Sequence, residues 1–339
     1  MTLTLARQPA AAPAEAAPGR SCPLHYRYRP EVFASPASEG LDGLDVLYVV
    51  GGLYGNRLAL DRVFELFDRE KGLKRLVFNG DFHWFDADAE GFDHVQRGVL
   101  AHTALRGNVE TEIAATESAE GDAGCGCAYP DWVGDGVVER SNRILGRLRR
   151  AANETQRAQL AALPMWLRAD VGDVRLGIVH GDAQSLAGWG FSQEHLRDAA
   201  HRRTVRDWFE RARVDAFGCT HTCLPVFQGL RENRRAAPRW VLNNGAAGMP
   251  NFAGDGAGLF TRIALRPFRG SVRRYGLSIG ATPSSRVHAE AIAIEIDADA
   301  WHREFLQLWP AGSDAHQSYF DRIARGPAYQ PSDAIRVEE

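Results

Sequence analysis

Residues 44–81, LDVLYVVGGLYGNRLALDRVFELFDREKGLKRLVFNGD, decide the fold of this chain. The segment opens with an apolar run that ends in a glycine-rich turn, which is typical of a strand buried on both faces. Asn56 can then cap a helix that stops at Gly72. Apolar residues recur there at the spacing of one helix face: Leu60, Val63, Phe64 and Phe67. RLVFNGD predicts a second strand ending at Asp81, and this βαβ unit predicts a parallel sheet.

Polar residues end three later apolar segments in the same way. The segment TALRGN ends at Asn108, the apolar part of VRLGIVHGD ends at His180, and that of VDAFGCTH ends before His221. RWVLNNGAAG predicts another strand, followed by a glycine-rich turn. A helix over about 192–213 is predicted with one apolar face made by Leu196, Ala199, Ala200, Val205, Trp208, Phe209 and Ala212. Because ligand sites in open α/β sheets lie where strands end, we expect a site at these residues.

The rest of the chain predicts one α/β domain with additions. Residues 1–43 are expected to be a disordered leader followed by an N-terminal arm, and residues 44–270 the domain itself. Residues 111–163 are predicted to form an inserted cap segment beside the site. Residues 271–339 are predicted to be an extension packed on the same domain, with an alternating strand in RVHAEAIAIEID and two helical segments.

Composition limits the class of protein. The 339 residues are 45% hydrophobic and 24% charged, which is ordinary for a globular chain, and the net charge of −3 predicts no nucleic-acid or membrane-surface partner. No apolar stretch approaches the roughly 18 residues of a membrane span. The five cysteines are odd in number and are expected to be reduced, in a cytoplasmic protein.

Five short motifs at the predicted strand ends occur in a characteristic order: GGLYGN, GD, GNVE, HGD and GCTH. Over residues 44–265 this order resembles the calcineurin-like metallophosphoesterase family, whose pattern is Asp-x-His, Gly-Asp, Gly-Asn-His, a histidine near glycine, and Gly-His-x-His. NNGAAGMP at 243–250 resembles the matching turn of small bacterial members. The resemblance implies a four-layered α/β/β/α sandwich with two divalent metals that activate a water for attack on a phosphate.

The resemblance implies roles for individual residues. Asp81 matches the carboxylate that bridges both metals, while Asn108 and His180 match ligands of the second metal. His221 matches a ligand of the first metal, and Cys219 stands where another histidine belongs. A thiolate is a competent ligand for zinc and other borderline metals. The implied cofactor is a divalent ion (Mn, Zn, Fe or Mg) with one firm site and an incomplete second one.

The first motif departs from the family. Residues 52–54 read Gly-Leu-Tyr where the family has Asp-x-His, so the first metal would keep only Asp81 and His221. His83, which recreates an Asp-x-His spacing with Asp81, and Asp86 are the candidates to fill the vacant position. The third motif has Val109 in place of a histidine that assists the leaving group, which disfavours protein phosphatase activity.

Three residues are predicted to bind substrate: Tyr54, Asn56 and Asn244. Tyr54 and Asn56 each have an alternative structural role. The ring of Tyr54 could instead pack over the Asp81 turn, and Asn56 could cap the first helix, whose N-terminus favours anions in either case.

The metal-ligand candidates also have structural alternatives. Asp81 could cap a turn, Asn108 could form an Asx turn, and His180 and His221 could be hydrogen-bonded core residues. Cys219 could be a small buried apolar group. Cys125 and Cys127 are spaced too tightly for a usual zinc knuckle and could be a packing feature, an exposed redox pair, or a cap element facing the metals.

Two functions follow from these patterns. The first is a metal-dependent phosphoesterase that hydrolyses a small phosphodiester or phosphomonoester, with Asp81, Asn108 and His221 as catalytic residues. The second is a degenerate member that binds a phosphorylated ligand or a protein partner without hydrolysis, motivated by the loss of Asp-x-His. The patterns predict neither the substrate nor the oligomeric state.

Overall fold

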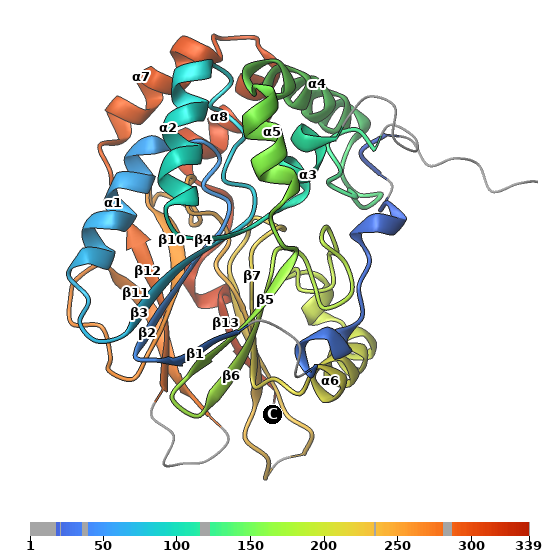
Figure 1. Ribbon diagram of the computed structural model, residues 1–339, viewed down its shortest axis with the longest axis vertical. Helices are drawn as coiled ribbons and strands as arrows, with labels where there is room; N and C mark the ends of the chain where they lie inside the picture. The colour runs from blue at the N-terminus through green and yellow to red at the C-terminus, as the bar shows by residue number, and fades with distance from the viewer. Residues whose placement is uncertain are drawn as a thin grey trace, which may run out of the picture.

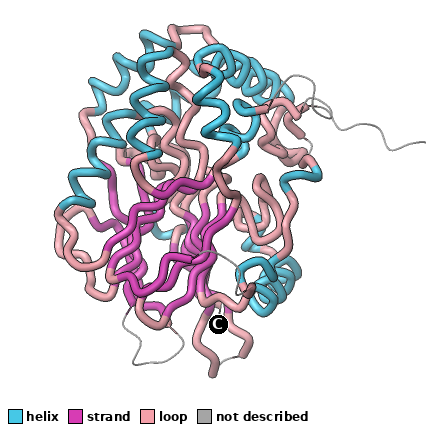
Figure 2. The backbone as a smooth tube through the Cα atoms, viewed as in Figure 1, coloured by secondary structure: helices cyan, strands magenta, loops and turns pink. Residues whose placement is uncertain are grey.

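Two β-sheets lie face to face at the centre of the structure, with helices outside them (Figures 1 and 2). The computed structural model describes residues 18–20, 22–35, 40–115, 123–233, 235–280 and 287–338. The predicted leader at 1–17 therefore lies outside the described residues. Val49 of one sheet is fully buried against Gly218 of the other, where an added Cβ would lie 3.5 Å from the Val49 side chain. The main core fills the space between the sheets.

The first sheet contains the predicted βαβ unit. Its six strands are, in order, β11 (Arg273–Ile279), β12 (Val287–Ile294), β10 (Gly258–Ala264), β2 (Val46–Val50), β3 (Lys74–Asn79) and β4 (Thr103–Leu105). β2, β3 and β4 are parallel, whereas β10, β11 and β12 are antiparallel to their neighbours. The predicted parallel sheet is therefore one half of a mixed sheet.

The second sheet is also mixed. Its seven strands are, in order, β1 (Gly40–Leu44), β5 (Trp166–Val171), β6 (Val174–Val179), β7 (Ala216–Cys219), β9 (Arg239–Asn243), β8 (Val226–Leu230) and β13 (Ile335–Val337). β6, β7 and β9 are parallel, so the ends of β6 and β7 point the same way.

Helices cover both outer faces, which gives the predicted α/β/β/α layers. α1 (Arg57–Asp68) and α2 (Ala89–Leu100) lie on the first sheet, and α6 (Ala199–Ala212) lies on the second (Figure 1). The remaining helices gather at the top of the view in Figure 1: α3 (Asn108–Ala114), α4 (Asp135–Ala151), α5 (Glu154–Ala161), α7 (Ala298–Leu308) and α8 (Asp314–Arg325). They stand at the end of the sheets where β3, β4, β6 and β7 finish.

The local predictions for α1 are confirmed. The Asn56 side chain accepts a hydrogen bond from the Ala59 backbone N–H, as an N-cap does, and the predicted apolar face is buried except for half-buried Phe64. The predicted helix over 192–213 is too long. α6 begins only after Asp198, which caps it, and Ala199 and Ala200 are exposed rather than buried.

The segments outside the predicted domain contribute to the sheets. β1 begins before residue 44 and pairs with β5, and the arm buries Tyr26 and Phe33. In the C-terminal extension, the predicted alternating strand is β12, which lies between β10 and β11, and β13 forms an edge of the second sheet. The extension is thus integral to both sheets rather than packed on a finished domain.

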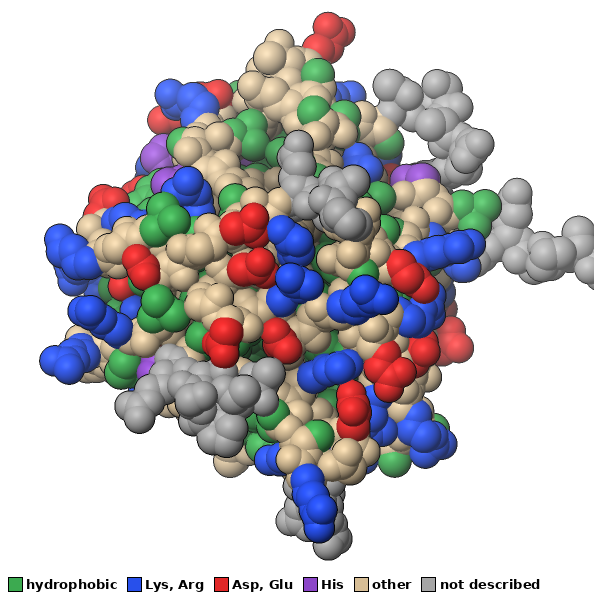
Figure 3. Space-filling model, turned by 60° about the horizontal axis from the view of Figure 1, so that its bottom comes forward, with side chains coloured by type: hydrophobic (Ala, Val, Ile, Leu, Met, Phe, Trp, Pro, Cys, Tyr) green, Lys and Arg blue, Asp and Glu red, His purple; other side chains and the backbone are tan. Residues whose placement is uncertain are grey.

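The surface carries both signs of charge. Acidic and basic side chains are interspersed across the middle of the face that Figure 3 displays. Exposed ion pairs link neighbouring segments, as between Arg168 and Asp42 at 2.9 Å. Among the described residues, no helix has both the length and the apolar character that crossing a membrane requires.

Candidate metal centre

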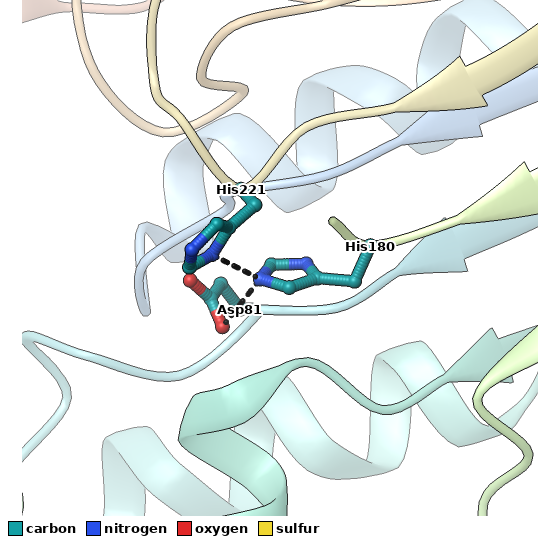
Figure 4. Close-up of side chains that lie close together, drawn as sticks. All are labelled: Asp81, His180 and His221. Carbon is teal, nitrogen blue, oxygen red and sulfur yellow. Dashed lines mark hydrogen bonds and ion pairs between the residues drawn. The ribbon is translucent and has the colours of Figure 1, made fainter. Parts of the chain in front are cut away.

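Four polar side chains from distant parts of the chain meet where strands of both sheets end. Asp81 follows β3, Asn108 opens α3 three residues after the end of β4, His180 follows β6, and His221 follows β7. All four are buried. Figure 4 shows Asp81, His180 and His221 converging from three separate loops. The predicted convergence at one end of the sheets is therefore observed.

The ring nitrogen Nε2 of His180 lies at the middle of this group. It is 3.0 Å from Asn108 Oδ1, 3.1 Å from His221 Nδ1 and 3.3 Å from Asp81 Oδ1. Ligand atoms of Asp81, His180 and His221 all lie within 4.8 Å of one another. No other group of three or more His, Cys, Asp or Glu side chains in the described part of the chain meets this distance.

The hydrogen bonds at the outer side of the group make all four central atoms acceptors. His180 Nδ1 donates to the Asn79 carbonyl at 3.0 Å, which leaves a lone pair on its Nε2. His221 Nε2 donates to the Cys127 carbonyl at 3.1 Å, which leaves a lone pair on its Nδ1. Asn108 Nδ2 donates to the Cys125 carbonyl at 2.9 Å, which turns its oxygen inward. Four acceptors that face one another require a cation or a shared proton.

The distances fit a metal ion. Metal bonds of about 2.0–2.2 Å place neighbouring ligand atoms about 3.0–3.5 Å apart in octahedral or tetrahedral geometry. The three separations measured from His180 Nε2, which are 3.0, 3.1 and 3.3 Å, lie in this interval, and the ligand atoms of Asp81 and His221 lie within 4.8 Å of each other. Two imidazoles, an amide and a carboxylate suit zinc, iron and manganese. The residues present therefore fit a single divalent cation.

The close packing of these groups shifts the pKa values of His180 and His221 in opposite directions. Burial alone would lower the pKa of His180, but the Asp81 and Glu110 carboxylates and the Asn79 carbonyl together raise that pKa. Burial and the adjacent His180 lower the pKa of His221 to about 3. His221 is thus neutral at physiological pH and is available as a ligand.

A buried carboxylate holds the turn that presents Asp81. Asp81 has a left-handed backbone with φ of 52°. Glu110 is fully buried and accepts hydrogen bonds from the backbone N–H groups of Asp81 (2.8 Å), Phe82 (3.0 Å) and Gly107 (2.8 Å). The side chain of the GNVE glutamate therefore fixes the loops that carry both oxygen ligands.

A cavity of about 60 Å³ lies beside the four residues. Its wall includes Asp81, His221, Tyr54, Cys127 and Cys223. Its remaining wall is largely aromatic, with half-buried rings of Tyr129, Trp189 and Tyr319. The predicted cap segment supplies part of this cover, since the Cys127 carbonyl also accepts from the indole N–H of Trp189 at 3.0 Å.

The position of the lost Asp-x-His motif is filled by an aromatic ring. A Cβ added at Gly52 would lie 2.9–3.0 Å from ring atoms of Tyr54. The Tyr54 hydroxyl lies 2.8 Å from the Cys223 thiol, and the residue has a φ of 55°. The packing role of Tyr54 is therefore observed, and because the residue also lines the cavity with Asp81, its contact with substrate stays a prediction.

Cys219 does not join the centre. Successive side chains of a strand point to opposite faces. Gly218 faces the other sheet, so Cys219 is turned to the α6 side, where its thiol lies in an apolar cluster with Trp208 and Phe209. The prediction of Cys219 as a metal ligand is therefore wrong, and its alternative as a buried apolar group is observed.

His83 and Asp86 do not fill the vacant position either. His83 Nδ1 lies 2.6 Å from Asp86 Oδ2, and its ring stacks on Phe92 at 3.7 Å. Asp86 Oδ1 accepts from the Trp84 backbone N–H at 3.0 Å. Both side chains are buried in this separate network, which corrects the prediction that either could reach the first metal.

Two of the predicted substrate-binding residues have structural tasks. The Asn56 side chain caps α1 and donates to the Gly248 carbonyl at 3.1 Å. Asn244 donates to the carbonyls of Gly51 (3.1 Å) and Leu259 (2.9 Å). Both are fully buried and neither lines the cavity, so these two predictions are corrected.

Several residues of the site were missed by the predictions. The only sequence feature that pointed to Glu110 was its place as the last residue of the GNVE motif. The only one that pointed to Cys223 was its position two residues after His221. Cys125 and Cys127 are both buried, so they are not an exposed pair. Cys127 lines the cavity, as the cap alternative expected, with its thiol 3.4 Å from Asn108 Nδ2.

Comparison with solved structures supports the architecture. A metallophosphoesterase from Sphaerobacter thermophilus matches with a TM-score of 0.51 and 14% identity, over 84% of this chain and 100% of that one. A hypothetical protein from Pyrococcus horikoshii OT3 matches with a TM-score of 0.53 and 15% identity, over 84% and 99%. No protein-family profile matches the sequence, and no curated protein matches it.

The chain therefore has the metallophosphoesterase fold, and the predicted resemblance is confirmed at the level of the fold. At 14–15% sequence identity, the similarity to these two structures shows only that the fold is shared. The chemistry rests on this chain's own residues, of which a buried Asp81, His180 and His221 group could bind a metal.

Proposed function

We propose that this protein is a metal-dependent phosphoesterase that holds one divalent cation on Asp81, Asn108, His180 and His221. The observation that supports this most strongly is the clustering of four buried acceptor atoms, with three of them 3.0–3.3 Å from His180 Nε2 and the ligand atoms of Asp81, His180 and His221 all within 4.8 Å of one another. A bound cation would polarise a phosphate ester and lower the pKa of a water molecule beside it.

The protein's own residues would position the phosphate. The cavity beside Asp81 and His221 is lined by Tyr54, Tyr129 and Tyr319, whose hydroxyl groups can donate hydrogen bonds to phosphate oxygens in place of their present partners, which include the Cys223 thiol and the Ser141 hydroxyl. Trp189 and the neighbouring rings exclude water from this space, which strengthens such polar contacts. Val109 in the wall can neither donate nor accept a proton.

The size of the cavity limits the substrate. About 60 Å³ leaves room for little more than a phosphate group, so the rest of an ester must leave the pocket past the half-buried rim of Tyr129, Trp189 and Tyr319. We infer a small phosphodiester or phosphomonoester. A phosphorylated protein loop is a poorer fit.

The experiment combines metal analysis with a turnover assay. Purified protein is loaded with Mn²⁺ or Zn²⁺, and its metal content is measured beside hydrolysis of a chromogenic phosphodiester and monoester. Asp81→Asn and His180→Ala should each lose the metal and should lower turnover at least about 10²-fold. Asp68→Asn, at an exposed position at the end of α1, is the matched control and should behave as wild type.

Equal turnover in wild type and Asp81→Asn would contradict the hydrolytic proposal. Absence of metal from wild-type protein after loading would contradict the metal centre itself.

A second function is favoured by one observation. The Tyr54 ring fills the space beside Gly52, so the ligands of the first metal are missing and cannot be replaced there. In this alternative the protein binds a phosphorylated ligand or a partner without hydrolysis. Stoichiometric metal together with no turnover on any ester tested, and with phosphate binding that needs His180, would favour it.

A further inference from the structure

The cap segment carries one exposed indole close to the cavity. Trp132 is 60% exposed, whereas every other Trp, Tyr and Phe side chain in the described part of the chain is buried or half-buried. Single exposed apolar side chains are common on protein surfaces, so exposure alone indicates no function. The neighbours of Trp132 are what make its exposure informative.

Trp132 continues the row of aromatic rings that lines the cavity. Trp189, in the cavity wall, has its ring centroid 5.7 Å from that of His221. The Trp132 ring stands edge to face with Trp189, with centroids 6.2 Å apart and an interplanar angle of 87°. Tyr129, another ring of the wall, lies 6.3 Å from Trp189. The aromatic wall thus reaches from His221 to an exposed indole in two ring-to-ring steps.

The turn that carries Trp132 is fixed. Residues 130–133 form a turn that is closed by a hydrogen bond from the Val133 N–H to the Pro130 carbonyl at 3.0 Å. The guanidinium group of Arg20, in the N-terminal arm, donates to the carbonyls of Pro130 (3.0 Å) and Val133 (2.6 Å). A ring on a turn held in this way is already ordered, so a contact with it costs little conformational entropy.

The surface of Trp132 remains open to a ligand. Trp189 and His195 contact the ring, with centroids at 6.2 and 5.5 Å, and more than half of the side chain still faces solvent. The cavity of about 60 Å³ holds little more than a phosphate group, so the rest of an ester passes the half-buried Trp189. A group that leaves on this side meets the Trp132 ring, and flat aromatic groups stack favourably on an indole.

We propose that Trp132 determines specificity by stacking on a flat aromatic group of the substrate while the phosphate occupies the cavity. The substrate class is then a phosphate ester that carries an aromatic ring, either a nucleobase joined through a sugar or an aryl group joined directly. The proposal rests on the proposed function, because it places the phosphate beside Asp81 and His221. Trp132 lies away from the reacting bond, so it stabilises the bound substrate and the transition state equally.

The test measures kcat and KM of metal-loaded, full-length protein for adenosine monophosphate, p-nitrophenyl phosphate and glycerol phosphate. Trp132→Ala should raise the KM of the aromatic esters about tenfold, with kcat nearly unchanged, and should leave the KM of glycerol phosphate as it is. Comparing variant with wild type for each ester removes the differences between leaving groups. Trp132→Tyr should restore most of the loss. Leu73→Ala, at another exposed apolar position, is the matched control and should behave as wild type.

The pattern across the esters identifies the source of the ring. An effect on adenosine monophosphate alone assigns a nucleobase, an effect on p-nitrophenyl phosphate alone assigns an aryl group, and an effect on both assigns aromatic rings in general. Equal losses on all three esters, or no loss on any, would overturn the role of Trp132.

A binding measurement separates this proposal from the hydrolytic one, because it needs no turnover. Calorimetry with nonhydrolysable phosphonate analogues of the same three compounds should show that wild type binds an aromatic analogue about tenfold more tightly than the glycerol analogue. Trp132→Ala should lose this preference. If no ester is hydrolysed and the preference is found, hydrolysis fails and the stacking role stands. Wild type without the preference overturns the stacking role, and that result does not depend on the folding of any variant.

Discussion

At the scale of single residues, the centre depends on which ring nitrogen of each histidine is engaged outside it. The Asn79 carbonyl takes the Nδ1 proton of His180, and the Cys127 carbonyl takes the Nε2 proton of His221. The two free nitrogens then face each other at 3.1 Å. Backbone carbonyls thus set the tautomers, which is how outer contacts usually prepare histidine ligands for a metal.

Replacing Glu110 should weaken the support of the metal centre without changing any of its four ligand residues. Glu110→Gln keeps one acceptor oxygen but replaces the other with a donor, which faces backbone N–H groups of Asp81, Phe82 or Gly107. We expect a loss of about 1–3 kcal/mol in the free energy of unfolding, measured by urea denaturation. Glu154→Gln, at an exposed position of α5, should change it little. Equal midpoints for the two variants would show that the buried contacts of Glu110 contribute nothing.

At the scale of elements, the turn between β2 and α1 explains why the first metal motif is missing. The chain passes Gly52 and Tyr54 with left-handed backbone at both, and the Tyr54 ring folds back over Gly52. Any side chain at residue 52 would collide with this ring. Gly52 and Tyr54, which replace the Asp and the His of the family motif, therefore depend on each other.

This dependence predicts the outcome of rebuilding the motif. Gly52→Asp alone should destabilise the protein, because its Cβ would lie 2.9 Å from the Tyr54 ring. Gly52→Asp/Tyr54→His removes the collision and supplies a carboxylate and an imidazole beside Asp81. We expect the double variant to be more stable than Gly52→Asp alone but less stable than wild type, because the left-handed φ of 65° at residue 52 strains an aspartate, and to bind one more equivalent of Mn²⁺ than wild type. Identical Mn²⁺ content in wild type and the double variant would argue against this reading of the turn.

Local signals predicted the elements well, because each is written in a short stretch. The apolar runs, the Asn56 cap and the spacing of Leu60, Val63 and Phe67 all describe β2, α1 and β3 correctly. The meeting of His180 with His221 was also predictable, since β6 and β7 are parallel neighbours that end on the same side of one sheet, whereas Asp81 comes from the other sheet and its place beside them was implied only by the family resemblance.

The direction in which a side chain points, and the contacts between segments far apart in the sequence, could not be predicted in the same way. The motif order placed Cys219 in a ligand position, but strand alternation turns it toward α6. The roles of Cys127 and Tyr54 depend on how a cap loop and a glycine turn fold over the cavity, and no periodicity encodes that. The start of α6 was misplaced because Asp198, its cap, was not recognised.

At the scale of the whole molecule, the centre joins the two sheets. Asp81 and Asn108 belong to the first sheet, and His180 and His221 to the second. The side-chain amide of Asn79 strengthens the same junction, since it donates to the Val179 carbonyl at 3.0 Å. A cation held by ligands from both sheets would therefore stabilise their packing.

Metal removal should accordingly lower the thermal stability. A ligand present at about 100 times its dissociation constant stabilises the folded state by about 2.7 kcal/mol. We expect chelation with EDTA to lower the Tm by several degrees and added Zn²⁺ to restore it, measured by calorimetry. His180→Ala should have a Tm that neither treatment changes much. A wild-type Tm that is insensitive to both treatments would contradict a metal shared by the two sheets.

The most direct measurement is an anomalous-scattering map from crystals of the wild-type protein grown with Mn²⁺. The account predicts a strong peak about 2.0–2.3 Å from His180 Nε2, His221 Nδ1, Asn108 Oδ1 and a carboxylate oxygen of Asp81. Crystals soaked to saturation that show no peak there, with the two imidazoles hydrogen-bonded to each other through a proton, would contradict it.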